Sequence, residues 1–275
     1  MNKDIRLIAF DLDETLLNSD KTLSQKNKET LLRAAESGIY LVPATGRLAF
    51  AVPDCVRALP YQYVIAANGA EVTQTDTGDC IYSAYIPNAR AVDLMRYFDT
   101  LPVAYDCYMV DKAFMAEKFL DAIEEYIGTP AYIEMARRIR IPVPYLPDHL
   151  LRVGQPLKKL QLFTRDPIYK AELIKTLTDM CPDLAVTAST PENIEINARE
   201  ATKGNALKAL CRHLGISPEQ AMAFGDSFND ITMISVAGLG VAMENAEPEV
   251  RRAADYITLN NNESGVAAAV EKFCF

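Results

Sequence analysis

The chain has 275 residues, 49% of them hydrophobic, and 28 basic against 37 acidic side chains give it a formal net charge of −9. This composition excludes a disordered chain, and the length allows one large core or two domains. The acidic balance argues against a nucleic-acid partner, which needs clustered Lys and Arg, and no apolar run approaches the ~20 residues of a membrane span. The N-terminal apolar run is too short for a signal peptide, so we expect a cytoplasmic protein with free cysteine thiols.

The first part of the chain alternates strands with helices. Residues 7–10 are predicted to form a buried strand. A helix is predicted to follow it, because Ser24 is a typical N-cap residue and Gly38 is a typical residue at a helix C-terminus. A strand at 39–44, a helix at 49–59 and a strand at 63–67 follow. The order β-α-β-α-β predicts a parallel sheet with helices on its faces.

The last part of the chain resumes this alternation. Thr202 is expected to open a helix that runs to Arg212, and a single turn at 217–220 precedes a strand at 221–224. Further predicted elements are a helix, a strand at 239–243, a helix at 248–254, a strand at 256–259 and a final helix.

More than a hundred residues separate these two parts, whereas one crossover of a parallel sheet takes roughly 30 residues. The segment has elements of its own, with strands predicted near 103–110, 159–164 and 185–188 and helices near 89–99, 112–127 and 167–180. We therefore predict a core formed by residues 1–86 and 191–275, interrupted by an α+β domain at 87–190. A basic run at 136–140 is expected to be a solvated face, with a ligand site as the alternative.

Polar residues gather where the predicted strands of the core end. In a doubly wound sheet, ligands bind at the carboxyl ends of the strands. The residues at these ends are Asp11, Asp13, Thr45, Gly46, Arg47, Asn68, Gly69, Asp226, Asn229 and Asp230, with Lys203 at a helix start on the same rim. We expect them to line one crevice.

The chemistry of this set favours a magnesium and phosphate site. Clustered carboxylates without His or Cys suit Mg²⁺, whose charge would offset the repulsion between Asp11 and Asp13. Thr45 and Lys203 could hold an anion such as phosphate. A carboxylate beside a bound phosphoryl group can attack phosphorus and form an aspartyl-phosphate.

The motifs resemble those of the haloacid dehalogenase superfamily of phosphatases, in particular the Cof-type branch with a large inserted cap domain. The sequence Asp11-Leu12-Asp13-Glu14-Thr15 is similar to the first motif of that family and Thr45-Gly46-Arg47 to the second. Lys203 matches the third motif, and the run from Gly225 to Asp230 matches the fourth. The order, the spacing and the place of the insert fit over the whole chain, and the resemblance implies a Rossmann-like α/β core with an α+β cap.

The resemblance also implies a role for each matched residue. Asp11 would be the nucleophile and a metal ligand, and Asp13 would bind the metal through its carbonyl and act as the acid and base. Thr45, Gly46 and Lys203 would hold the phosphoryl oxygens, Asp226 would bind the metal, and Asp230 would support it or bind through water. Asn229 would lie near the phosphate or orient Lys203, and Arg47 would either steer the substrate or brace its loop.

Glu14 departs from the family pattern, which commonly has Gly at this position. If the backbone there is left-handed, Glu is expected to cost about 1 kcal/mol or more. Ser227 similarly stands where Asn is frequent.

These residues predict a Mg²⁺-dependent phosphomonoester hydrolase that acts on a small phosphorylated metabolite, such as a sugar phosphate or a phosphorylated cofactor. A phosphomutase of the phosphomannomutase type and a catalytically weak binding or sensor protein on the same fold are the alternatives. The complete set of Asp11, Asp13, Lys203 and Asp226 argues against the last of these.

Overall fold

The computed structural model describes residues 4–109, 112–188 and 190–275. Contacts within the chain divide it into two units. The core unit consists of the chain up to Ser83 together with Ala201–Phe275, and the inserted unit is Ala84–Glu200.

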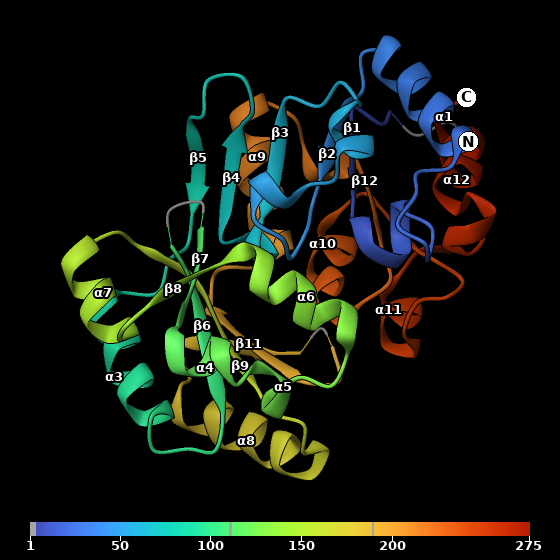
Figure 1. Cartoon of the computed structure of the whole chain (residues 1–275). Coiled ribbons are helices and arrows are strands. Elements are labelled where there is room, and N and C mark those ends of the chain that lie inside the picture. Colours follow the sequence, from blue (N-terminus) through green and yellow to red (C-terminus); the bar gives the residue numbers. More distant parts are fainter. Residues whose placement is uncertain (1–3, 110–111, 189) are drawn as a thin grey trace. The chain divides into compact units, whose positions relative to one another are not determined.

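The core unit is built on a parallel sheet of five strands in the order β14-β13-β12-β1-β2 (Figure 1). Leu7 of β1 lies between Tyr40 of β2 and Ala221 of β12, so strands from the two ends of the chain pair side by side in this sheet. The strands are β1 (Leu7–Phe10), β2 (Tyr40–Pro43), β12 (Ala221–Gly225), β13 (Leu239–Ala242) and β14 (Tyr256–Ile257). The predicted doubly wound α/β core is confirmed.

Helices cover both faces of this sheet because successive strand residues point to opposite sides. Ile8 and Phe10 pack in one cluster with residues of α1, α11 and α12, whereas Leu7 and Ala9 pack in another with α9. Figure 1 shows α1 and α12 side by side, and Arg33 and Glu271 form an ion pair of 2.6 Å between them. The helices are α1 (Gln25–Glu36), α2 (Asp54–Arg57), α9 (Lys203–Leu214), α10 (Ile231–Val236), α11 (Pro248–Ala253) and α12 (Gly265–Cys274).

The strand predicted at 63–67 is present, but it does not extend the parallel sheet as expected. Strand β3 (Tyr63–Ala66) pairs antiparallel with β4 (Glu71–Gln74), which pairs with β5 (Cys80–Ser83) in a separate three-stranded sheet. The link to the main sheet is an isolated parallel bridge between Ala44 and Ile65. The positive φ angles of Asn68 and Gly69 reverse the chain here, so the next strand returns beside β3.

Two other predicted elements of the core unit are shorter than expected. The helix predicted at 49–59 is a 3-10 turn at Ala49–Ala51 followed by α2, because Pro53 holds the preceding Val52 in an extended conformation. The strand predicted at 256–259 has two residues in the sheet.

The inserted unit has a six-stranded sheet in the order β10-β11-β9-β6-β7-β8, antiparallel except for the pair β7–β8. Its strands are β6 (Ala104–Met109), β7 (Lys112–Ala116), β8 (Arg140–Val143), β9 (Leu157–Phe163), β10 (Leu184–Thr187) and β11 (Asn193–Ala198). Its helices are α3 (Asn88–Phe98), α4 (Glu117–Asp121), α5 (Ile123–Tyr126), α6 (Pro130–Ile139), α7 (Leu146–Val153) and α8 (Pro167–Met180).

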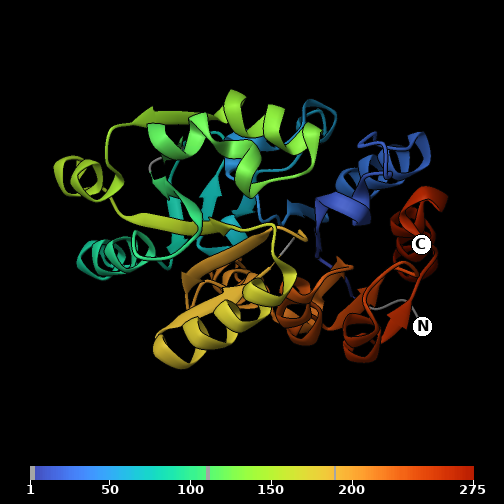
Figure 2. The same cartoon turned by 60° about the horizontal axis from the view of Figure 1, so that its bottom comes forward.

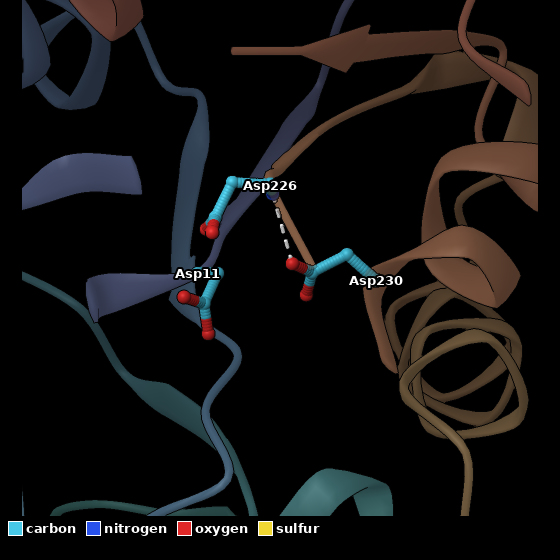
Figure 3. Close-up of side chains that lie close together, drawn as sticks. All are labelled: Asp11, Asp226 and Asp230. Atoms are coloured by element: carbon cyan, nitrogen blue, oxygen red, sulfur yellow. Dashed lines mark hydrogen bonds between the residues drawn. The ribbon is translucent and has the colours of Figure 1, made fainter. Parts of the chain in front are cut away.

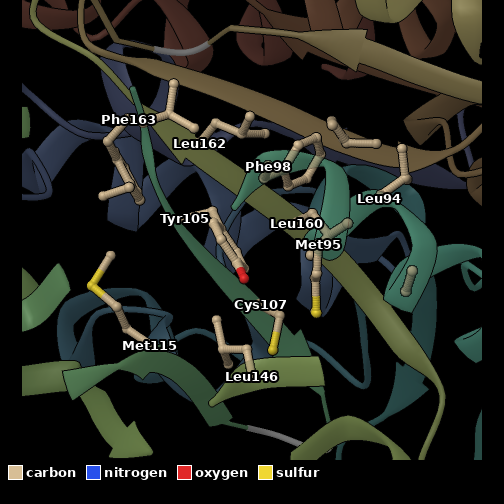
Figure 4. Close-up of a cluster of buried hydrophobic side chains, with 14 of the residues drawn as sticks. Leu94, Met95, Phe98, Tyr105, Cys107, Met115, Leu146, Leu160, Leu162 and Phe163 are labelled. Atoms are coloured by element: carbon tan, nitrogen blue, oxygen red, sulfur yellow. The ribbon is translucent and has the colours of Figure 1, made fainter. Parts of the chain in front are cut away.

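The inserted unit has its own hydrophobic core. Side chains of α3, such as Met95 and Phe98, pack against Tyr105, Cys107 and Leu160 of the sheet (Figure 4). Helices α3 and α7 lie side by side in Figures 1 and 2. A separate buried core agrees with the prediction of an inserted α+β domain.

The sequence-based elements of the inserted unit differ from the structure in three places. The helix predicted at 112–127 begins as strand β7, which pairs with β6, and continues as α4 and α5. Val110, the predicted last residue of the strand before it, lies outside the described residues.

Strand β11 lies beyond the predicted domain end at 190 and pairs with β9, so the unit runs to Glu200. The elements α6, β8 and α7 are additional.

No helix in the described ranges is long and apolar enough to cross a lipid bilayer. The cysteines in these ranges form no disulfide.

A glycine lets α9 approach α10 closely. A Cβ atom on Gly204 would lie 2.4 Å from the carbonyl oxygen of Thr232. We predict that Gly204→Ala destabilises the protein by about 1–3 kcal/mol, because two packed helices would have to separate. Urea unfolding measures this, with Lys208→Ala on the exposed side of the same helix as the control; equal stability of the two variants would contradict the prediction.

Candidate active site

Lys203 is the centre of the site, because its ammonium group contacts two aspartates. Its Nζ atom lies 2.6 Å from Asp11 Oδ1 and 2.5 Å from Asp230 Oδ1. The Lys203 side chain is fully buried at the first turn of α9, whose N-cap is Thr202. A buried ammonium group is stable only when it is paired, and here two carboxylates hold it. These contacts raise the pKa of Lys203 against the opposing effect of burial.

Asp11 directly follows β1, and its backbone N–H donates to the carbonyl oxygen of Phe224 in β12 at 3.0 Å. Burial raises the pKa of Asp11 well above its usual value, Lys203 lowers it, and Asp230 and Asp226 raise it further. The carboxylate therefore lies where added positive charge would stabilise its ionised form.

Asp226 and Asp230 belong to the loop that follows β12. Asp226 accepts hydrogen bonds from Thr15 Oγ1 at 2.6 Å and from Ser227 Oγ at 2.9 Å. The Oδ2 atom of Asp230 accepts from the backbone N–H groups of Asp226 and Ser227, both at 3.0 Å. The same carboxylate thus shapes the loop through one oxygen and holds Lys203 through the other.

Asp11, Asp226 and Asp230 form a group that can bind a metal ion (Figure 3). Their nearest ligand oxygens all lie within 4.8 Å of one another, and all three residues are buried. Burial and the charge of Asp230 raise the pKa of Asp226 to about 6. An all-oxygen donor set with unbalanced negative charge fits Mg²⁺, so the residues present are suited to the predicted ion.

The side chain of Asp13 is not part of this group and is held by Arg47. The guanidinium donates from Nε to Asp13 Oδ2 at 2.8 Å and from Nη2 to Oδ1 at 2.7 Å, which is a bidentate ion pair. Lys21 Nζ lies 3.3 Å from Asp13 Oδ1. Burial raises the pKa of Asp13, but Arg47 and Lys21 outweigh it and lower the pKa below its usual value.

The predicted phosphate-binding loop lies at the end of β2. Thr45 is buried, and its hydroxyl accepts from the backbone N–H of Arg47 at 3.1 Å. A Cβ atom on Gly46 would lie 2.8 Å from Asn68 Oδ1, so a larger residue would crowd Asn68. Asn229 Nδ2 donates to the same Asn68 oxygen at 3.0 Å, which links this loop to the loop after β12.

Glu14 adopts the left-handed backbone conformation, with φ 58° and ψ 11°. Its side chain accepts hydrogen bonds from Lys21 at 2.8 Å, Ser19 at 3.0 Å and Asn261 at 3.2 Å, and Asn245 donates to its carbonyl oxygen at 2.8 Å. These bonds offset the strain of about 1 kcal/mol that a residue with a Cβ atom suffers here. Glu14 also holds the lysine that contacts Asp13.

Some residues around the site were not singled out from the sequence. Lys21, Asn245 and Asn261 belong to no motif, because they reach the site only through tertiary contacts that the fold creates, with Glu14 and, for Lys21, also with Asp13. The hydroxyl of Thr15 donates to Asp226 Oδ1, so it joins the loop after β1 to the loop after β12.

Comparison with known proteins identifies the family to which this chain belongs. The family model described as haloacid dehalogenase-like hydrolase matches residues 8–270. A 5-amino-6-(5-phospho-D-ribitylamino)uracil phosphatase of Bacillus subtilis, YcsE, is 32% identical over 97% of this chain and 95% of its own length. Phosphatase YwpJ of the same organism is 31% identical over 96% of this chain and 98% of its own.

Solved structures agree with these relatives. A haloacid dehalogenase-like hydrolase from B. subtilis matches with a TM-score of 0.82 and 29% identity, covering 97% of this chain and 99% of that one. Another from Bacteroides thetaiotaomicron matches with a TM-score of 0.80 and 30% identity, covering 98% and 99%. The chain belongs to the haloacid dehalogenase-like hydrolase family. It is an enzyme of that family, a Cof-type phosphatase.

We predict that Lys203→Met destabilises the protein more at pH 8 than at pH 5. Without the ammonium group, Asp11 and Asp230 stay buried without a counter-charge, and loss of one partner of a buried pair costs about 3–5 kcal/mol. The pKa of Asp11, already raised, rises further in the variant, so protonation at low pH relieves the repulsion and the loss grows as pH rises. Urea unfolding at both pH values measures the difference. The exposed Lys208→Met serves as the control, and an equal loss at both pH values would argue against the electrostatic role.

Proposed function

We propose that the protein is a Mg²⁺-dependent phosphomonoesterase that hydrolyses a small phosphorylated metabolite through an aspartyl-phosphate on Asp11. The observation that supports this most directly is the contact of Lys203 with Asp11 in the group that also contains Asp226 and Asp230. A nucleophilic carboxylate, a buried cation and an acidic metal site within one group meet the main requirements of phosphoryl transfer.

In the first step, an Asp11 oxygen attacks phosphorus and the bond from phosphorus to the leaving oxygen breaks. Protonated Asp13 donates its proton to that oxygen, so that an alcohol leaves. In the second step, Asp13 takes a proton from water, which attacks the aspartyl-phosphate and releases inorganic phosphate and free Asp11. The Arg47 pair stabilises the ionised form of Asp13 and therefore suits this second step.

Other residues of the core unit would hold the phosphoryl group. Thr45, Gly46 and Asn229 lie on loops joined by the bonds of Asn68, and Lys203 would supply positive charge. Arg47 would act by positioning Asp13, which favours the bracing role over direct steering of substrate.

Asp11, Asp226 and the Asp13 carbonyl would hold Mg²⁺, with Asp230 in support. The ion would supply positive charge that offsets the repulsion between the phosphoryl group and the carboxylates.

The substrate class is proposed from the relatives. YcsE carries in its name a substrate with one phosphate on a ribityl chain. We infer a comparable small phosphomonoester here, a sugar phosphate or a phosphorylated cofactor, with the inserted unit as a cap that selects the leaving group. A cytoplasmic location without nucleic-acid or membrane partners stays a prediction.

Release of free phosphate distinguishes the hydrolase from the two alternatives. A phosphomutase would convert a sugar phosphate to its isomer without releasing phosphate, and a sensor would bind the ligand without turnover. The same metabolite panel, followed by phosphate release and by sugar-phosphate isomer formation, separates all three.

We predict that Asp11→Asn abolishes phosphate release, because an amide cannot attack phosphorus at a useful rate. The loss should exceed about a thousandfold in kcat, while circular dichroism and thermal unfolding show a folded protein. Asp54→Asn is the matched control, since the Asp54 side chain is fully exposed at the start of α2 and should leave activity unchanged. Full activity of Asp11→Asn would remove the nucleophile assignment.

We predict that the affinity for Mg²⁺ falls as pH drops from 8 to 5. Metal binding requires ionised carboxylates, and Asp226 has a pKa of about 6, so protons compete with the ion below that value by about tenfold per pH unit. Titration calorimetry with MgCl₂ at both pH values measures this, and EDTA should abolish an activity that Mg²⁺ restores. The same affinity at pH 5 and 8, or activity insensitive to EDTA, would contradict the metal site.

A further inference from the structure

The carboxylate of Asp13 is contacted by cations from two separate loops. Arg47, in the loop after β2, donates to both of its oxygens. Lys21 belongs to a tight turn that precedes α1, and its Nζ atom lies 3.3 Å from Asp13 Oδ1. The turn is closed by the backbone N–H of Asn18, which donates to the carbonyl oxygen of Thr22 at 2.9 Å. This turn therefore places its lysine beside the proposed acid and base of the reaction.

Glu14 holds the ammonium group of Lys21 in this position. Lys21 Nζ donates to Glu14 Oε1 at 2.8 Å. The other oxygen, Oε2, accepts from Ser19 at 3.0 Å and from Asn261 at 3.2 Å. Ser19 belongs to the same turn as Lys21, whereas Asn261 lies in the turn before α12. One oxygen of Glu14 is thus anchored by two parts of the core unit while the other directs the lysine toward Asp13.

Both members of this ion pair have a backbone conformation that glycine adopts at lower cost. The φ angle is 58° at Glu14 and 66° at Lys21. Their side chains are 41% and 48% exposed, and an exposed ion pair contributes little to stability. Stability alone therefore does not account for side chains at two positions that suit glycine. Residues in this conformation are concentrated at functional sites, so we looked for the function of the pair in its contact with Asp13.

Arg47 by itself does not fix the place of the Asp13 carboxylate. A bidentate ion pair sets the plane of a carboxylate relative to the guanidinium, but the two side chains can still move together, and here they are 37% and 34% exposed. A second cation from another loop removes this freedom, because the carboxylate then has to satisfy contacts in two directions. Proton transfer requires the donor and the acceptor within hydrogen-bond distance, so a displaced carboxylate slows the reaction.

We propose that Lys21, oriented by Glu14, is a positioning residue that keeps the Asp13 carboxylate in place for proton transfer. In the first step the proton goes from Asp13 to the leaving oxygen, and in the second it goes from water to Asp13. Lys21 acts through Asp13 in both steps. That Asp13 transfers these protons rests on the proposed function, whereas the place of its carboxylate can be tested without turnover. All the residues concerned belong to the core unit.

The first test compares two kinds of leaving group. The leaving oxygen of an alkyl phosphate needs a proton, whereas p-nitrophenolate leaves without one. Wild type, Lys21→Met, Lys21→Arg and the control Lys26→Met are assayed with Mg²⁺ for phosphate release from p-nitrophenyl phosphate, glycerol 3-phosphate and hexose monophosphates. Lys26 is exposed on α1 and provides a matched loss of one lysine.

Lys21→Met should lower kcat/KM about tenfold on the alkyl phosphates and less than about threefold on p-nitrophenyl phosphate, because the loss falls on proton donation to the leaving oxygen. Lys21→Arg keeps the positive charge and should stay within about threefold of wild type on both. Lys26→Met should match wild type. An equal loss on the two kinds of substrate, no loss, or a loss in Lys21→Arg as large as in Lys21→Met would overturn the proposal.

A second test separates positioning from a role in stabilising the turn. Lys21→Gly removes the same ammonium group but suits the left-handed backbone, so it should lose as much activity as Lys21→Met while its urea midpoint equals or exceeds that of wild type. Glu14→Gln combined with Lys21→Met should be no less active than Lys21→Met alone, because Glu14 acts through the lysine. Additive losses, or activity in Lys21→Gly equal to that of wild type, would contradict the assigned role.

Crystal structures of wild type, Lys21→Met and Lys26→Met test the positioning without turnover. The Asp13 side chain should have one conformation in wild type and in the control, and it should shift or show a second conformation in Lys21→Met. Such a change supports the proposal even if wild type releases no phosphate, a result that would contradict only the hydrolase. An Asp13 carboxylate in the same place in all three proteins would overturn the positioning role, whatever the activity of wild type.

Discussion

The structure of the core unit depends on one buried ammonium group. Lys203 has no exposed side-chain surface and is held by Asp11 from the first strand and Asp230 from the loop after β12. Each of these three charges would be unfavourable in the protein interior alone, and each is tolerated because the others are there. Lys203 is the first residue of α9. Its pairing with Asp11 and Asp230 therefore also fixes the start of this helix beside the carboxyl ends of β1 and β12.

Small residues make the required close approaches possible. A Cβ atom on Gly69 would lie 2.3 Å from the carbonyl of Thr202, the N-cap of α9, and one on Gly225 would lie 2.3 Å from Asp230 Cβ. The loop after β12 then uses Asp230 both to cap its own turn and to hold Lys203. Packing and charge compensation are thus satisfied by the same few residues, so the loss of one should affect both stability and chemistry.

Much of the core fold and its site follows from local patterns in the sequence. The buried run at β1, the caps of α1 and α9 and the polar residues at strand ends are short-range signals, and they predicted the parallel sheet and the grouping of Asp11, Lys203 and Asp226. Features that depend on partners far along the chain were not predictable in this way. Strand β3 leaves the main sheet because it pairs with β4, and β11 joins the inserted unit because it pairs with β9.

The same limit applies to individual side chains. In the sequence, Arg140 is one more charged residue of a basic run. Its burial depends on the tertiary contact with Asp106 of β6, two strands away in the sheet. Glu14 could be identified as unusual from the motif, but the residues that stabilise its backbone come from distant loops around Asn245 and Asn261. A tertiary contact network has no local sequence signature, even when every residue in it is ordinary.

The strand order of the core unit also determines how late in synthesis its sheet can be completed. β1 and β2 precede the insert, whereas β12, which pairs with the other side of β1, follows it, and the bonded residues Thr15 and Asp226 are 211 positions apart. A growing chain therefore carries an incomplete sheet with an unpaired edge on β1 until almost all of the protein has left the ribosome, and such edges favour aggregation. The inserted unit, as one continuous segment, has all its strands available earlier and meets no such delay.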